Sequence, residues 1–328
     1  MAEYRRLRVL NDETVHTEIE TFAKPEIDEG EVLIAVRYSG INYKDALATK
    51  ANTGVLRDYP MTPGIDLAGK ILTSNDPNLQ PGDSVLVTGY GLGAKQDGGL
   101  SQLQVVPAAW CVKIPAGLDE KQVMTFGTAG FTAALAVDAL QKHGLTADSR
   151  VLVTGATGGV GSFAIHFLKQ IGCKEIIALS RKEDQKDYLT KLGATSIVSP
   201  AELFPEKNRP LNKQLTDFVV DTVGGDTLAK VLPFVNYGGS LALCGNAGGI
   251  KLTTTVLPFI LRGVNLLGID SVEASMSQRQ KLWQKMADEW TLPAGIAVQE
   301  ITLEQVPAIA DALLAGKHVG RTIVDLEV

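Results

Sequence analysis

Residues 151–161, VLVTGATGGVG, decide the fold of one half of this chain. A β-branched and aliphatic run ends at Gly155, further glycines follow at positions 158, 159 and 161, and a helix-like run covers 162–171. A strand that enters a helix through such a turn presents free backbone N–H groups and the positive helix end to a phosphate. Glycines are needed because side chains would block the turn or the approach of the phosphate. The stretch therefore predicts a dinucleotide-binding unit, with phosphate contacts from Thr157, Gly158, Gly159 and Val160.

The residues after the next strand-like run indicate which dinucleotide is bound. Glu175 to Leu179 (EIIAL) predicts the second strand, and three polar residues follow at its C-terminal end. An NAD site usually places a carboxylate there to accept a hydrogen bond from the ribose 2′-OH. A hydroxyl followed by two cations suits a 2′-phosphate, although the cations also fit a solvated, charged helix start. The sequence therefore predicts NADPH rather than NADH, held by Ser180, Arg181 and Lys182.

The bulk composition is typical of a soluble globular protein with two domains. The chain has 328 residues, of which 45% are hydrophobic and 21% charged, with a net charge of −6. This acidic balance argues against nucleic acid or an anionic membrane as a partner. No run approaches about 18 uninterrupted apolar residues, so a cytoplasmic location is expected. Three cysteines, Cys111, Cys173 and Cys244, lie too far apart for a disulfide framework or a cysteine zinc site.

The pattern of apolar and polar residues changes near residue 121. Residues 1–120 contain short alternating runs and turn signals, which predict a β-rich domain. Beyond them, an Ala-rich helix is expected over 127–140, followed by recurrent strand candidates with helical stretches between them. That alternation predicts a doubly wound parallel sheet of α/β class. The tail returns to a strand–helix–strand pattern, so we expect a nucleotide domain, 121–295, inserted into a β-rich domain formed by 1–120 and 296–328.

Several longer motifs resemble a known family over essentially the whole chain. PGD, GTAGFTA, TGATGGVG and LGA resemble the medium-chain dehydrogenase/reductase superfamily, at 81–83, 127–133, 154–161 and 192–194. Other segments resemble, more specifically, the YhdH/YhfP-type quinone oxidoreductases, also described as NADPH-dependent acrylyl-CoA reductases. These segments are SGINYKDALA (39–48), YPMTPGIDLAG (59–69), VDTVGG (220–225), YGGS (237–240) and PFILRGVNLLGIDSV (258–272).

The resemblance implies a GroES-like catalytic domain, a Rossmann domain and a homodimer. It also implies hydride transfer from NADPH to the activated C=C bond of an enoyl thioester, an enone or a quinone. Zinc-dependent relatives carry cysteine and histidine ligands at the positions aligned with Asn42 and Ile65. An amide and an isobutyl group cannot replace a thiolate and an imidazole, so a metal-independent reaction is expected.

Three residues in the GINYKD segment are candidates for the chemistry. The resemblance places Tyr43 at the nicotinamide, where its phenol would donate a hydrogen bond or a proton, or would only form a wall of the cleft. Asn42 would donate its amide to the substrate carbonyl or hold the loop. Asp45 is expected to organise its own loop. Water remains an alternative proton source.

Other cofactor contacts are expected where strands of the parallel sheet end. The expected contacts are Asn246, Ile269 and Ser271, and Thr128, which would meet the nicotinamide or cap a helix. Acceptor specificity is expected from irregular segments such as 50–59. Lys50, Arg57 and Arg262 could contact a CoA phosphate, but the sequence favours solvated surface charge for each of them. The alternative functions are one-electron quinone reduction and a catalytically idle, redox-sensing NADPH-binding protein.

Overall fold

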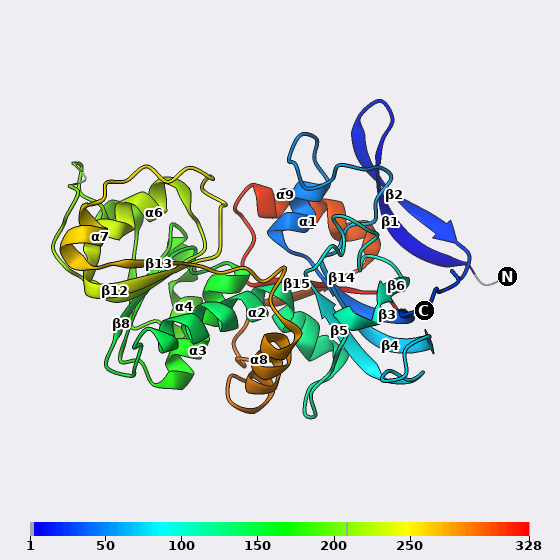
Figure 1. Cartoon of the computed structure of the whole chain (residues 1–328). Helices are drawn as coiled ribbons and strands as arrows, with labels where there is room; N and C mark the ends of the chain where they lie inside the picture. Colours follow the sequence, from blue (N-terminus) through cyan, green and yellow to red (C-terminus); the bar gives the residue numbers. More distant parts are fainter. Residues whose placement is uncertain (1–2, 208, 328) are drawn as a thin grey trace. The chain divides into compact units, whose positions relative to one another are not determined.

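Two sheets of different kinds organise this chain. The computed structural model describes residues 3–207 and 209–327. It divides into unit 1, which comprises residues up to 128, 271–287 and 297 onward, and unit 2, which comprises 129–270 and 288–296 (Figure 1). The structure has the α/β class that the sequence predicted, with one mainly antiparallel sheet and one parallel sheet.

Unit 1 is built on a mainly antiparallel sheet with the strand order β14-β15-β3-β4-β5-β7, and β6 pairs with β3. The bounds are β3 Glu31–Gly40, β4 Asp66–Ser74, β5 Ser84–Thr88, β6 Leu103–Pro107, β7 Val112–Lys113, β14 Val298–Ile301 and β15 Arg321–Asp325. Side chains that alternate along β3 and β4 contribute Val32, Ile34, Val36, Leu67 and Ile71 to one apolar core. Helices α1 (Tyr43–Ala48) and α9 (Val306–Leu314) pack on each other beside the sheet.

A separate hairpin opens the chain. Strands β1 (Tyr4–Asn11) and β2 (Val15–Phe22) pair in antiparallel register around a short turn (Figure 1). The hairpin is attached to the rest of unit 1 by backbone hydrogen bonds from Leu7 N to Leu100 O (2.9 Å) and from Val9 N to Met61 O (2.8 Å). The tip of the hairpin, at Glu13 and Thr14, lies across a pocket from residues that follow α1.

Unit 2 contains a parallel sheet with the strand order β10-β9-β8-β11-β12-β13. The strands are β8 Arg150–Val153, β9 Glu175–Leu179, β10 Ser196–Val198, β11 Thr216–Asp221, β12 Val235–Leu243 and β13 Asn265–Gly268. Helices α3 (Gly159–Ile171), α4 (Lys186–Leu192), α5 (Pro200–Leu203), α6 (Gly225–Val231) and α7 (Leu257–Arg262) lie between them in sequence. The order reverses at β8, and ligands bind at such a switch point in doubly wound sheets.

Helix α2, Glu120–Lys142, is long and apolar but has a break within it. Gly127 adopts φ 52° and ψ −157°, a conformation open only to glycine, and interrupts the helix. By length and composition α2 could cross a membrane, yet 89% of its most apolar window is buried inside the protein. Burial at that level is expected of a core helix, and a core helix was predicted here over 127–140.

Segment 271–287 differs from the predicted domain division, since it groups with unit 1. The segment carries most of α8 (Met276–Asp288). Arg279 is fully buried and donates to the carbonyl oxygens of Thr88 (2.7 Å) and Ser271 (3.0 Å). Trp283 packs edge-on against Phe126, with ring centroids 6.2 Å apart. Residues 121–128 also group with unit 1 rather than with the nucleotide unit, and residue 296 groups with unit 2.

Candidate active site

Tyr43 is the first residue of α1 and is held by a short loop. Asp45, two residues later, accepts a hydrogen bond from Asn42 N (2.8 Å), and its other oxygen accepts from Gly64 N (3.0 Å) and Ile65 N (2.9 Å). These bonds fix the start of the helix to the loop that precedes β4. The Tyr43 ring is half-buried, and its hydroxyl has no hydrogen-bond partner in the described part of the chain.

Behind this loop lies a cluster that we call the Asp66 hub, made of Asn42, Asp66, the Thr128 N–H and Arg321. One Asp66 oxygen accepts from Gly40 N (2.8 Å), and the other accepts from Asn42 Nδ2 (2.9 Å) and Thr128 N (2.8 Å). Arg321 donates to Asn42 Oδ1 (3.1 Å), and its guanidinium lies 4.0 Å from Asp66. Asp66 and Arg321 are 0% and 3% exposed. Each buried charge is therefore stabilised by the opposite charge of the other residue.

Burial changes the titration of the groups around the hub. The pKa of Asp45 is raised to about 7, first by burial and second by the neighbouring charge of Asp66. Hydrogen bonds from Asn42 and Ile65 oppose that rise in the pKa. Burial lowers the pKa of Arg321, and the Asp66 and Asp45 carboxylates oppose this. The group that holds the Tyr43 loop therefore changes its charge near neutral pH.

The break in α2 is what brings Thr128 to the hub. A Cβ at Gly127 would lie 2.5 Å from an Arg321 nitrogen and 2.8 Å from an Asp66 oxygen, so only glycine fits. The positive φ at Gly127 frees the next N–H from the helix and directs it to the Asp66 carboxylate. Asn42 uses both ends of its amide inside the hub, which supports its loop-holding role. Direct contacts of Asn42 and Thr128 with substrate or nicotinamide stay predictions.

The donor set in this region does not fit a zinc ion. The Asn42 amide is committed to Asp66 and Arg321, and Ile65 offers only an alkyl group. Across residues 3–207 and 209–327, no group of three or more His, Cys, Asp or Glu side chains could hold a metal ion. Asp45 and Asp66 are saturated by N–H donors, and this arrangement leaves them as loop anchors.

In unit 2, the glycine turn forms a cradle at the start of α3. Gly155 has φ 56°, and a Cβ there would collide with Thr222 Oγ1. A Cβ on Gly161 would lie 2.5 Å from Gly155 O, so the helix packs directly on the turn. Gly158 caps the helix, and the first N–H groups of a helix have no intrahelical acceptor. The structure thus brings Thr157, Gly158, Gly159 and Val160 together at a positive helix end that fits a diphosphate.

Another buried carboxylate stabilises this cradle, and its role was not predicted from the sequence. Asp221 ends β11 and accepts from Thr154 Oγ1 (2.7 Å) and Gly224 N (2.7 Å). Thr154 also accepts from Thr222 N (3.0 Å), so the ends of β8 and β11 are joined. Burial raises the pKa of Asp221. The signal was present in the sequence as a polar residue that closes an apolar strand.

The turn after β9 is local and partly exposed. Ser180 is buried, and its hydroxyl accepts from Lys182 N (3.0 Å), while the Arg181 side chain is exposed. Burial is the main cause that lowers the pKa of Lys182, and the charge of Arg181 lowers it further. Ser180 and Lys182 line one small pocket of about 20 Å³ together with Lys186, which the sequence analysis did not single out. The three predicted phosphate-binding residues therefore lie on one turn.

The remaining predicted cofactor residues lie at strand ends or beyond them. Asn246 is exposed after β12, and Ile269 follows β13 and donates its N–H to Leu243 O (2.9 Å). Ser271 groups with unit 1 and not with the nucleotide unit. Burial raises the pKa of Cys244 to about 12, which keeps the thiol protonated and supports a packing role. The cofactor contacts of Asn246, Ile269 and Ser271 stay predictions.

Comparisons with known proteins agree with this geometry. Residues 28–116 match the alcohol dehydrogenase GroES-like domain, and residues 159–289 match the zinc-binding dehydrogenase domain. The acrylyl-CoA reductase AcuI of Ruegeria pomeroyi is 46% identical over 92% of each chain. The chain belongs to the medium-chain dehydrogenase/reductase family. The predicted resemblance is confirmed, although the described residues offer no fitting ligands for the zinc in the name of the second domain.

Two solved structures resemble nearly the whole chain. Escherichia coli K-12 YhdH with bound NADPH is 40% identical, with a TM-score of 0.93, and the match covers 98% of this chain and 100% of that chain. Bacillus subtilis yhfP with NAD bound is 41% identical, with a TM-score of 0.94, and the match covers 99% of this chain and 100% of that chain. One of these structures therefore holds NADPH and the other holds NAD.

Proposed function

We propose that this member of the family is an NADPH-dependent reductase of activated C=C bonds in α,β-unsaturated carbonyls. Its acceptors would be those of the acrylyl-CoA reductase or quinone oxidoreductase type. The observation that carries the proposal is Tyr43, a phenol fixed by buried groups whose hydroxyl has no partner in the described residues. The similarity to acrylyl-CoA reductase AcuI supports the reaction type.

The nucleotide unit would bind NADPH through two sets of groups. The first-turn N–H groups of α3 and the residues from Thr157 to Val160 would hold the diphosphate. Ser180, Arg181 and Lys182 would hold the 2′-phosphate, since a hydroxyl and two cations complement its charge. When bound, NADPH supplies the hydride for the reaction.

Tyr43 would act on the substrate oxygen. As hydride adds to the β-carbon, negative charge develops on the carbonyl oxygen, and a phenol O–H held nearby stabilises it. The proton that finally reaches the α-carbon would come from Tyr43 or from water. Asn42, Asp66 and Arg321 would keep Tyr43 in place through the hydrogen bonds that Asn42 makes to the two buried charged residues.

We further propose a cytoplasmic homodimer that acts on a small molecule. Three free cysteines without a disulfide agree with a reducing compartment. In unit 2, β13 is one of the two edge strands of its sheet, and exposed apolar side chains follow β12 or lie on α7: Ile250, Val256, Ile260 and Leu261. An unpaired strand edge with exposed apolar neighbours is a common site of subunit pairing.

The test is NADPH oxidation with acryloyl-CoA, crotonyl-CoA, simple enones and quinones, combined with product identification. A saturated carbonyl product supports the proposal. Radical products from quinones would indicate one-electron chemistry. Tight NADPH binding without oxidation by any of these acceptors would instead indicate a redox-sensing protein without catalytic activity.

A further inference from the structure

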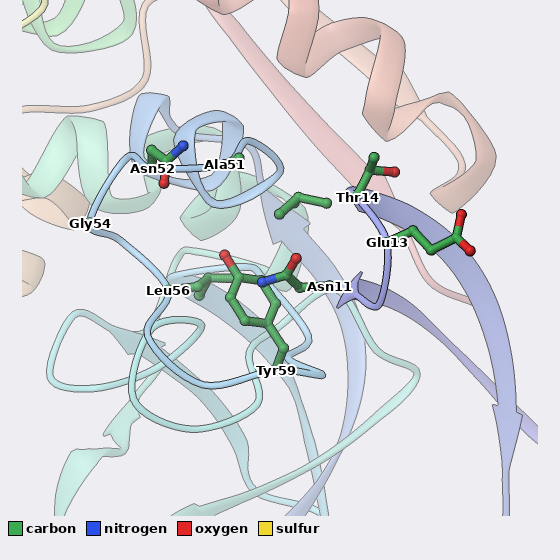
Figure 2. Close-up of a pocket in the computed structure, with 9 residues that line it drawn as sticks. Asn11, Glu13, Thr14, Ala51, Asn52, Gly54, Leu56 and Tyr59 are labelled. Carbon is green, nitrogen blue, oxygen red and sulfur yellow. The ribbon is translucent and has the colours of Figure 1, made fainter.

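A large open pocket lies in unit 1 beside the hairpin tip and the loop that follows α1 (Figure 2). Its volume is about 670 Å³, within the range of sites for small molecules. The hairpin contributes one side and the loop contributes the other. The lining residues are Asn11, Glu13, Thr14, Val15, Ala51, Asn52, Gly54, Leu56 and Tyr59.

The chemistry of the lining selects an uncharged, amide-rich ligand. Asn11, Asn52 and Thr14 supply amide and hydroxyl groups that both donate and accept hydrogen bonds. Leu56 belongs to an apolar cluster, and Val15 and Tyr59 pack against it. No lysine or arginine lines the pocket, and the Glu13 carboxylate disfavours a phosphate inside it.

The pocket is joined to the proposed catalytic residue by one short helix. Tyr43 begins α1 and Ala48 ends it, a length of about 9 Å for six residues. Ala48 is a buried member of the cluster that contains Leu56, and Ala51 lines the pocket three residues later. The pocket therefore begins about one short helix away from Tyr43 along the chain.

Arg57 is a cation in the loop that lines this pocket, although its own side chain is not part of the lining. It lies between Leu56 and Tyr59 in sequence, its side chain is exposed, and no ion pair or hydrogen bond holds it within the described residues. The adjacent Asp58 is exposed as well. The other two cations considered from the sequence already have interaction partners. Lys50 forms an ion pair with Asp311 at 2.7 Å, and Arg262 donates to backbone carbonyls in unit 2.

We propose that this pocket binds the pantetheine arm of a CoA thioester and that Arg57 contacts the diphosphate beyond it. The arm carries two amides, a hydroxyl and a pair of methyl groups, which match the amides, hydroxyl and apolar floor of the pocket. A quinone or a simple enone has no comparable arm. The proposal rests on the proposed function and adds a site that favours thioesters over those acceptors.

The first experiment uses acryloyl-CoA, acryloyl-pantetheine and acryloyl-N-acetylcysteamine as a series of shortened substrates. Asn52 has φ 60°, so Asn52→Gly removes the amide without backbone strain, and it is combined with Asn11→Ala. We expect the kcat/KM of the two longer substrates to fall about tenfold through KM, because two hydrogen bonds are lost. The kcat/KM of the N-acetylcysteamine thioester should not change. An equal loss for all three substrates would overturn the proposal.

The second experiment tests the cation. Arg57→Gln should lower kcat/KM for acryloyl-CoA alone by about threefold at low ionic strength, and the loss should disappear at high salt. Lys70→Gln is the matched control, since Lys70 is an exposed cation on β4 away from the pocket lining. Loss of activity with acryloyl-pantetheine in Arg57→Gln, or the same loss in the control, would contradict a diphosphate contact.

The third experiment measures binding without turnover. Ala51→Trp should fill the pocket and abolish calorimetric binding of pantetheine, whereas Ala116→Trp, at an exposed turn outside the pocket, should not. Unchanged pantetheine binding by Ala51→Trp would overturn the pocket assignment while leaving the proposed function intact. If the unmodified protein reduced no acceptor yet lost pantetheine binding in Ala51→Trp, the pocket would stand and the proposed function would fail.

Discussion

The loop at 42–45 and the turn at 180–182 are both assigned to binding or chemistry, yet they are built in opposite ways. The first is held by buried charges that come from distant parts of the chain, with Asp66 and Arg321 both nearly inaccessible. The second is a short turn in which Ser180 accepts from Lys182 N and Arg181 extends into solvent. The loop at 42–45 is held by contacts with residues distant in sequence, and the turn at 180–182 is held by contacts between neighbouring residues.

The difference indicates how each region responds to change. A group that positions a reacting atom needs neighbours that cannot relax, and a buried hub provides them. A group that recognises a phosphate works through charge and accessibility, which an exposed turn provides. We therefore expect mutations in the first region to alter catalysis or stability strongly, and mutations in the second to alter only cofactor choice.

Tyr43→Phe should produce the largest effect. If the phenol stabilises the enolate oxygen, kcat falls by roughly 10²–10⁴-fold, while the Kd for NADPH barely changes. The ring and its packing are retained, so the loss isolates the hydroxyl. Steady-state kinetics with acryloyl-CoA and a fluorescence titration with NADPH measure the two quantities. If the Phe variant kept nearly full kcat, the Tyr43 ring would only form a wall of the cleft and its hydroxyl would have no role in the reaction.

Asp66→Asn should destabilise the folded protein more than any change at the exposed turn. The substitution removes the carboxylate next to the buried Arg321 guanidinium, which costs about 3–5 kcal/mol in the free energy of unfolding. Arg181→Ala is the comparison, with an expected change within about 0.5 kcal/mol because its side chain is exposed. Urea unfolding measures both. Similar losses of unfolding free energy in the two variants would contradict the difference in stability that we expect between the buried loop and the exposed turn.

Asp45 should make stability depend on pH. Its pKa is raised from 3.8 in the unfolded chain to about 7 in the folded chain, so between these values the folded chain retains a proton that the unfolded chain has lost. The free energy of unfolding should therefore fall as pH rises from about 4 to about 7, by something on the order of 2–4 kcal/mol. Asp45→Asn should flatten that slope. Parallel urea-unfolding profiles for the two proteins between pH 4 and pH 8 would contradict the assignment.

Arg181→Ala should have the smallest effect and one that is confined to cofactor choice. The unmodified protein is expected to prefer NADPH over NADH by about tenfold in kcat/KM, since one charge-assisted contact discriminates between them. The variant should lose most of that preference and use NADH almost unchanged. Equal use of both cofactors by the unmodified protein would remove the basis for the 2′-phosphate site.

The sequence predicted best what local pattern determines. The range Glu175–Leu179 is a strand with the expected bounds, because an apolar run is a property of a few neighbouring residues. The glycine turn before α3 was also predicted, since its glycines are required by local backbone geometry. The helix expected over 127–140 begins earlier, at Glu120, and contains the break at Gly127.

Long-range contacts could not be predicted in this way. Arg321 bonds to the Thr125 carbonyl across almost 200 residues of sequence (3.0 Å), and no local pattern identifies that partner. The same holds for Arg279, which ties 271–287 to Thr88 and moves that segment into unit 1. The role of Asn42 was left open because its two hydrogen-bond partners, Asp66 and Arg321, are distant in sequence.

The most direct test of the proposed chemistry is the destination of the hydride. The protein is incubated with NADPH that carries deuterium at the transferable position and with acryloyl-CoA or a simple enone. Our account predicts deuterium at the β-carbon of a saturated product, with the α-hydrogen derived from solvent, because the activated alkene presents an electron-poor carbon to the hydride. Deuterium on a newly formed alcohol carbon would contradict the account and would make the protein a carbonyl reductase.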